Sequence, residues 1–216
     1  QTEVSQGRLE ALLNFQTVIS DLTAMPLANC SLLDEATAAA EAATMMYGLR
    51  SRDQQKKGTN VLFVDESIFP QNLAVIQTRV IPQGMKIQVG NYKELEFTPE
   101  IFACIIQYPN ASGSVEDYRE FVEKAHAANC KVAVDADILS LALLLPPGEW
   151  GADIVFGSTQ RLGIPLFYGG PSAAYFATRD EYKRNMPGRI IGLSKDKYGK
   201  ICYRMALHTR DRKAHV

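Results

Sequence analysis

The sequence predicts an α/β fold, with a mostly parallel sheet, one antiparallel strand and helices on both faces. From residue 60 onward, short apolar runs alternate with helical patterns, which is typical of parallel strands connected by helices. The apolar run that begins at Ala152 ends in a small polar turn and a glycine-rich loop. A further apolar run, residues 173–177, returns too soon for a helical crossover, so we expect this strand to be antiparallel.

Two helices are predicted before the first strand. Ser5 is placed to cap the first, whose apolar positions from Leu9 to Ile19 fall near helical spacing and end before Pro26. The second opens at residues 34–37 and continues through the alanine-rich run 38–46. Alanine is the strongest helix former, and its small side chain permits close packing against a sheet.

Strands and helices then alternate. We expect strands at residues 61–64, 87–89, 102–107 and 131–134, followed by the run at Ala152. Helices are expected at residues 70–78, with proline in the first turn, and at residues 115–128, which are amphipathic. Residues 98–100 indicate a turn or a helix start.

The chain becomes more charged after Thr178. Residues 186–189 and 196–200 are interpreted as exposed turns, and residues 210–213 lack an apolar pattern and are expected to be poorly ordered. Because no low-complexity linker interrupts the sequence, we interpret residues 1–216 as a single domain.

Composition excludes some classes of partner. The net charge of −1 over 216 residues gives no electrostatic reason to expect nucleic acid or an anionic membrane. No apolar run approaches the roughly 20 residues that span a bilayer. The chain begins at Gln1, without methionine or a signal-type segment, which favours an internal piece or a processed product.

The cysteines predict no disulfide framework. Cys30, Cys104, Cys130 and Cys202 are widely spaced and form no C-x-x-C pair. Two of them lie in or beside predicted core strands. We therefore expect four unpaired thiols that pack as small apolar side chains, in a reducing compartment.

The ends of two predicted strands indicate a site. Asp137 ends one buried run and the turn Ser158–Arg161 ends the next, and parallel strands would bring these ends into one crevice. An aspartate there could neutralise a cationic ring nitrogen, as in pyridoxal phosphate enzymes. The helix start at Thr37 could hold the cofactor phosphate. The alternatives are ordinary: Asp137 as a helix cap and Thr37 as a first-turn residue.

The turn lacks the lysine that such a site needs to form an imine with the cofactor. Arg161 stands there with Ser158 and Gln160, and a guanidinium stays protonated and cannot form an imine at neutral pH. The lysines downstream, at 195, 197 and 200, lie in charged, glycine-containing sequence that indicates a solvated surface. His126, His208 and His215 lack metal-ligand spacing, so we expect no metal site.

Several strings resemble one family. They are residues 1–10 (QTEVSQGRLE), 31–42 (SLLDEATAAAEA), 147–155 (PGEWGADIV), 157–161 (GSTQR), 186–192 (MPGRIIG) and 204–210 (RMALHTR). Together they closely resemble the P-proteins of the glycine cleavage system, the decarboxylating glycine dehydrogenases. The resemblance runs essentially from end to end.

The resemblance implies a pyridoxal phosphate enzyme with the aspartate-aminotransferase-like fold, fold type I. The family decarboxylates glycine and passes the aminomethyl group to the lipoyl arm of the H-protein. Its members carry two homologous halves, and only the C-terminal half holds the imine-forming lysine. This chain resembles the large-domain segment of the N-terminal half, without the small domain. Where the other half reads asparagine, leucine, histidine and lysine, this chain reads Ser158, Thr159, Gln160 and Arg161.

The resemblance therefore implies no catalytic residue here and a vestigial cofactor pocket. Its residues would be Asp137, Thr37, Ser158, Gln160 and Arg161. Three positions depart from the usual family pattern, which commonly has histidine at 69 and 172 and a small apolar residue at 135, where this chain has Phe69, Ser172 and Asp135. We expect no covalently bound cofactor in this chain.

The main hypothesis is a scaffold that completes, by contact, the active site of the lysine-bearing half. One alternative is a non-catalytic module that docks the H-protein or holds an oligomer. Another is an independent small pyridoxal phosphate enzyme that uses an unrecognised lysine. The expected partners are the lysine-bearing half, the lipoylated H-protein and glycine. The expected compartment is the cytoplasm of a bacterium, or the mitochondrial matrix of a eukaryote, with the former favoured.

Overall fold

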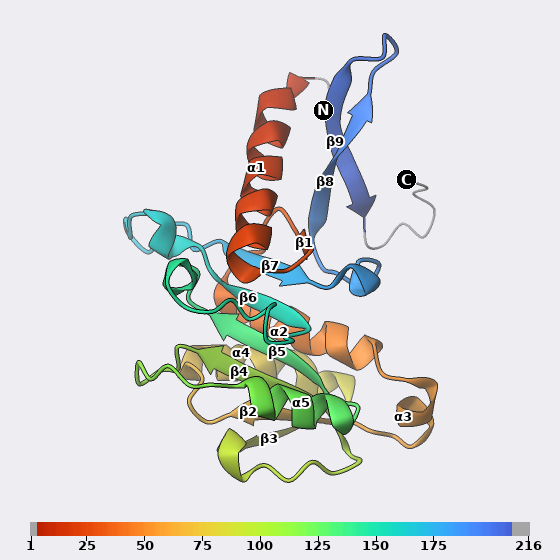
Figure 1. The fold of residues 1–216 in the computed structure, drawn as a ribbon, viewed down its shortest axis with the longest axis vertical. Helices are drawn as coiled ribbons and strands as arrows, with labels where there is room; N and C mark the ends of the chain where they lie inside the picture. The colour runs from red at the N-terminus through yellow and green to blue at the C-terminus, as the bar shows by residue number, and fades with distance from the viewer. Residues whose placement is uncertain (1–3, 209–216) are drawn as a thin grey trace.

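The computed structural model describes residues 4–208. Its core is a seven-stranded sheet with the order β1-β7-β6-β5-β4-β2-β3 (Figure 1). In chain order the strands are β1 (Leu27–Ala28), β2 (Val61–Asp65), β3 (Lys86–Gly90), β4 (Ile101–Tyr108), β5 (Lys131–Ala136), β6 (Ile154–Ser158) and β7 (Ala174–Thr178). The five central and edge strands from β6 to β3 are parallel, and β7 runs antiparallel to both of its neighbours. The predicted parallel sheet with one antiparallel strand is confirmed.

Five α-helices accompany the sheet in the described part of the chain. They are α1 (Gln6–Thr23), α2 (Glu35–Gly48), α3 (Arg52–Lys56), α4 (Pro70–Val80) and α5 (Arg119–Ala127). The helix expected from residue 115 begins only at Arg119, and this start was wrong. Asn110 accepts hydrogen bonds from the N–H groups of Ser112 and Ser114, which holds the preceding segment as a turn.

The helices cover both faces, as predicted (Figure 1). On one face, α2 packs against the sheet through alanines that are fully buried, and α4 packs beside it. On the other face, Tyr118, Phe121 and Val122 from α5 and the segment before it join a core with β4, β5 and β6. The absence of bulky side chains on α2 lets the helix lie close to the strands. This closeness brings the start of α2 to the sheet edge described below.

The segment after β7 differs from its prediction. Residues 189–208 form a two-stranded antiparallel hairpin, β8 (Arg189–Lys195) and β9 (Ile201–His208), which lies beside α1 and apart from the main sheet (Figure 1). The exposed turn expected at residues 186–189 was wrong, because Met186 is buried and Arg189 begins β8. The turn at residues 196–200 is confirmed, since Asp196 accepts hydrogen bonds from two N–H groups across it. Residues 210–213 lie outside the described range.

The structure also tests the expectations for Ser5 and for the cysteines. Ser5 is the residue that precedes α1, but its side chain makes no capping hydrogen bond. The four cysteines are free thiols, and Cys104 and Cys130 are buried in the core. Burial raises the pKa of both thiols, so they remain protonated and unreactive in the folded chain.

Candidate functional site at the carboxyl edge of the sheet

The turns after β5 and β6 meet at the carboxyl edge of the sheet. The two strands are parallel neighbours, with Asp135 opposite Phe156. Asp137 follows β5, and Arg161 lies in η5 (Gln160–Leu162), just after β6. Arg161 Nη1 lies 3.1 Å from Asp137 Oδ2, and both side chains are partly exposed. The predicted meeting of these two residues therefore occurs, as a direct ion pair.

The 3₁₀ helix after β5, η4 (Ser140–Ala142), has Leu139 as its N-cap and no side-chain cap, so the helix-cap alternative for Asp137 was wrong. Asp137 has a role in a turn instead. Its Oδ1 accepts a hydrogen bond of 3.1 Å from the N–H group of Leu139, which fixes the turn after β5. Asp137 thus uses one carboxylate oxygen for the turn and the other for Arg161. A cationic ring nitrogen would have to compete with the guanidinium for this carboxylate.

Ser158 and Gln160 shape the turn that carries Arg161. Ser158 Oγ accepts a hydrogen bond of 3.1 Å from the N–H group of Gln160. Gln160 also lines a cavity of about 390 Å³ with the glycine loop. In that loop a Cβ at Gly170 would lie 2.5 Å from the carbonyl oxygen of Leu166, so a larger residue would open the loop.

The backbone N–H group of Thr37 is not free to bind a phosphate. Its N–H group donates a hydrogen bond of 2.7 Å to Asp34 Oδ1, the cap of α2. Thr37 lines a cavity of about 590 Å³ that it shares with residues around Met186, and none of the other four predicted site residues lines that cavity. The helix start is therefore already occupied by the chain's own carboxylate, and a phosphate would meet that negative charge.

The sequence interpretation missed a buried carboxyl group at this edge, Asp135, with the partly exposed Glu35 beside it. Asp135 is only 1% exposed, and its Oδ2 accepts a hydrogen bond of 2.7 Å from Asn72 Nδ2. Burial raises the pKa of Asp135 well above its usual range, and the adjacent Glu35 raises it further. Asn72 Oδ1 is buried without a partner in the described structure.

A buried tyrosine completes this edge. The hydroxyl of Tyr175 donates a hydrogen bond of 2.6 Å to the carbonyl oxygen of Ala136. Burial raises the pKa of Tyr175 well above its usual value, and the nearby carboxyl groups, Asp135 foremost, add to this effect. Gly157 permits the contact, because a Cβ there would lie 2.3 Å from that same carbonyl oxygen. The alternation of side chains along β5 could have predicted from the sequence that Asp135 lies on the face of the sheet that α2 covers. It could not have predicted that Glu35 of α2 lies beside Asp135.

These groups do not fit a covalently bound pyridoxal phosphate. The turns after β5 and β6, residues 137–143 and 159–163, contain no lysine, and Lys131 lies at the other end of β5. The amide donor at Thr37 is taken, and Glu35 and Asp135 add carboxyl groups where a phosphate or an imine would have to approach. The edge carries one guanidinium among several carboxyl groups, which suits contact with another polar surface better than cofactor capture.

The family model and the similar proteins agree on one family. The model of a family described as glycine cleavage system P-protein matches residues 1–216. Glycine dehydrogenase (decarboxylating) from Bacteroides fragilis is 80% identical over 211 residues, which cover 98% of this chain and 22% of that protein. The protein of the same name from Flavobacterium johnsoniae is 57% identical, and the mitochondrial one from Dictyostelium discoideum is 52% identical. The chain thus spans about a fifth of the length of these relatives.

Solved structures show the same fold. A glycine decarboxylase (P-protein) of the glycine cleavage system, crystallised in inhibitor-bound form, matches with a TM-score of 0.86 and 33% identity, over 97% of this chain and 48% of that one. A methionine gamma lyase from Micromonospora echinospora matches with a TM-score of 0.59 at 18% identity, over 75% of this chain and 42% of that one. That second likeness is one of fold alone. Among the described helices, none is long and apolar enough to cross a membrane.

Proposed function

The chain belongs to the glycine cleavage system P-protein family, and from that premise we propose that it works as the large-domain segment of the N-terminal half of a glycine dehydrogenase (decarboxylating). The complete enzyme would decarboxylate glycine and transfer the aminomethyl group to the lipoyl arm of the H-protein. It would carry pyridoxal phosphate on the lysine of its C-terminal half. Likeness to bacterial relatives supports a bacterial cytoplasmic location.

The ion pair between Arg161 and Asp137 carries this proposal. The ion pair fills the position where the other half is expected to hold its lysine. The carboxylate of Asp137 lies 3.1 Å from the Arg161 guanidinium and is therefore already paired. A guanidinium has five N–H donors, and the Arg161 side chain is 61% exposed, so several donors face outward. This segment would therefore contribute a polar surface to the other half, and no nucleophile.

The neighbouring loop supports a role in contact. Leu166, Phe167 and Tyr168 are 72%, 70% and 108% exposed, which is unusual for three consecutive large apolar residues. They lie in the same loop region as Arg161, between β6 and β7. This observation also favours the docking or oligomerisation alternative. The independent-enzyme alternative lacks a lysine on either turn.

Substitution of Arg161 in the full-length enzyme tests the proposal. We expect Arg161→Gln to lower kcat for glycine decarboxylation by about tenfold or more at saturating H-protein, because the charged group that this segment would present to the active site of the other half is lost. The matched control is Arg79→Gln, which removes a surface ion pair with Glu41 on the α2–α4 side of the sheet. Thermal unfolding of both variants checks that they remain folded.

The same measurement separates the alternatives. A change in the KM for H-protein alone, with kcat unchanged, would favour the docking module. Full activity of Arg161→Gln in every respect would contradict the proposal that this edge completes the active site. The chain of residues 1–216 by itself is expected to show no glycine decarboxylase activity.

A further inference from the structure

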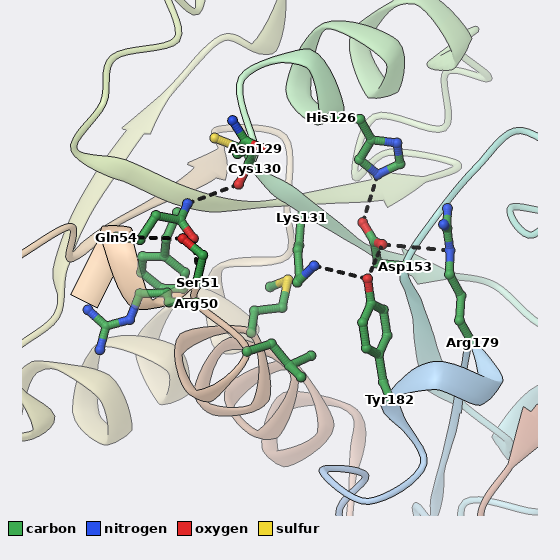
Figure 2. A pocket seen from close by; sticks show the side chains of 13 residues that line it. Arg50, Ser51, Gln54, His126, Asn129, Cys130, Lys131, Asp153, Arg179 and Tyr182 are labelled. Carbon is green, nitrogen blue, oxygen red and sulfur yellow. Dashed lines mark hydrogen bonds and ion pairs between the residues drawn. The ribbon is translucent and has the colours of Figure 1, made fainter. Parts of the chain in front are cut away.

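A second cavity, of about 330 Å³, lies at the opposite edge of the sheet (Figure 2). It opens where β5 and β6 begin, whereas Asp137 follows the carboxyl end of β5. Its walls include the end of α2, the first residue of β5 and the segment after β7, through Met46, Lys131 and Tyr182. It shares no residue with the site described above, and the proposed function makes no use of it.

Asp153 is the buried charge at one wall of this cavity. Its Oδ2 accepts hydrogen bonds of 2.8 Å from the N–H group of Val132 and from His126 Nε2. Its Oδ1 accepts one of 3.2 Å from the hydroxyl of Tyr182 and lies 3.6 Å from Arg179 Nε. These three hydrogen bonds and the nearby guanidinium hold Asp153 within the chain's own network and leave one of the four or so acceptor positions of a carboxylate.

The charge of Asp153 is also stable. Burial opposes its ionisation, but the hydrogen bonds from His126 and Val132 and the nearby Arg179 outweigh burial and hold its pKa below the usual range. Asp153 is the one carboxylate among the residues that line the cavity. Three cationic side chains, Arg50, Lys131 and Arg179, line the same cavity, so its lining disfavours a cationic ligand.

Lys131 supplies the available charge. Its Nζ donates a hydrogen bond of 2.9 Å to the hydroxyl of Tyr182, and an ammonium carries three N–H donors. The other two have no acceptor in the described structure. Arg50 and Arg179 also line the cavity, and backbone carbonyl oxygens hold each of them in place: Arg50 donates to those of Tyr47 and Thr59, and Arg179 to those of Gly151 and Ala152. Figure 2 shows the Lys131 ammonium between Asp153 and the apolar side chains at the end of α2.

The floor of the cavity is apolar. Met46 and Phe102 are buried and Leu49 is partly buried, and all three line the cavity below Lys131. Ligand cavities typically measure about 300–1,000 Å³, so this one suits a small molecule. The ammonium of Lys131 beside this apolar surface matches a carboxylate with a short hydrocarbon chain.

We propose that this cavity binds a small organic carboxylate, with the carboxylate group on Lys131 Nζ and the hydrocarbon part over Met46 and Leu49. The hydroxyl of Tyr182 orients the ammonium, and its hydrogen bond to Asp153 keeps Tyr182 in place. The site is separate from the carboxyl edge, so its occupancy does not depend on the proposed function.

Chemical footprinting of the unmodified full-length enzyme tests this site directly. The enzyme is acetylated at trace level with and without sodium butyrate, and peptide mapping gives the labelling rate of each lysine. We expect butyrate to slow labelling of Lys131 and to leave Lys86, an exposed lysine on β3, unchanged. Butylammonium and inorganic phosphate serve as probes with the wrong charge or no hydrocarbon. Equal protection by either probe, or no protection by butyrate, would overturn the proposal.

Variants give a second measurement that does not rely on labelling. We expect Lys131→Gln to weaken butyrate binding, followed by ligand-observed NMR, by about tenfold, because a charge-assisted hydrogen bond is lost. Lys131→Arg should retain most of the affinity, and the control Lys86→Gln all of it. Unchanged affinity in Lys131→Gln would overturn the assignment of Lys131. Should that variant fail to fold, the footprint on the unmodified enzyme decides.

Discussion

At the scale of single residues, Asp135 is the group whose surroundings change its chemistry most. It lies at the end of a central strand, is nearly inaccessible to water and faces the start of α2 with Glu35. Burial, with Glu35 beside it, raises its pKa, so the folded chain holds a proton on Asp135 at a pH at which the unfolded chain has lost it.

This difference predicts how stability depends on pH. A raised pKa in the folded state means that stability is greatest below the pKa of the unfolded chain, about 3.9, and falls as pH rises toward the folded value. We expect Asp135→Asn to remove this loss, because an amide cannot ionise and can still pair with Asn72. The variant should therefore gain free energy of unfolding relative to the parent chain as pH rises from about 4 to about 8.

Urea unfolding of the parent chain and the variant across that range measures the effect. The matched control is Asp21→Asn, at an exposed position of α1, which should follow the parent chain at every pH. A variant curve that runs parallel to the parent curve would show that Asp135 does not titrate differently in the folded state.

The sequence predicted the meeting of Asp137 and Arg161, because strand ends in a parallel sheet share one edge. The sequence could not predict that the N–H group of Thr37 donates its hydrogen bond to Asp34, because both residues are also compatible with a phosphate site. The pair of Asp135 and Glu35 was also beyond the sequence. The two residues are 100 positions apart and meet only because α2 packs closely on the sheet.

At the scale of elements, alternating apolar runs predicted every strand from β2 to β7, and alanine content predicted α2. Three kinds of element were missed. One is α3, a helix of five residues without a buried side chain. β1 has two residues and pairs with β7 through tertiary packing, which leaves no local signal. The β8–β9 hairpin was hidden by its charged composition, because only one face of it packs on α1 and the other is solvated.

We expect Gln16 to hold the β8–β9 hairpin against α1. From within α1 its Nε2 donates a hydrogen bond of 3.1 Å to the carbonyl oxygen of Ile191, and its Oε1 accepts one of 2.8 Å from the N–H group of Ile191. Gln16→Leu keeps the volume and leaves both backbone groups without a partner. We expect a cost of about 1–3 kcal/mol per unpaired buried group, which loosens β8 from α1.

Hydrogen exchange followed by mass spectrometry measures this loosening. The amides of β8 should exchange faster in Gln16→Leu, while those of β4 and β5 keep the parent rate. Gln77→Leu, at an exposed position of α4, is the control and should leave β8 unchanged. Equal protection of β8 in Gln16→Leu and the parent chain would show that the hairpin docks by apolar contact alone.

At the scale of the whole molecule, the chain is a family member that spans about a fifth of its relatives. Its sheet supplies two edges with different chemistry. The carboxyl edge carries an ion pair, the buried carboxyl group of Asp135 beside Glu35, and an exposed apolar loop, and the opposite edge carries a cavity lined by the ammonium of Lys131. Neither turn of the carboxyl edge holds a lysine, and our proposal that the cofactor chemistry lies in the rest of the enzyme rests on this feature.

The location of the cofactor in the full-length enzyme tests this account most directly. The enzyme is loaded with pyridoxal phosphate, reduced with borohydride and mapped by peptide mass spectrometry, beside the variant Arg161→Lys. We expect one stoichiometric pyridoxyl label that lies outside residues 1–216 in both proteins, with the introduced lysine labelled poorly because Glu35 and Asp135 disfavour the cofactor there. A stoichiometric label on a lysine within residues 1–216 of the unsubstituted enzyme would contradict the account.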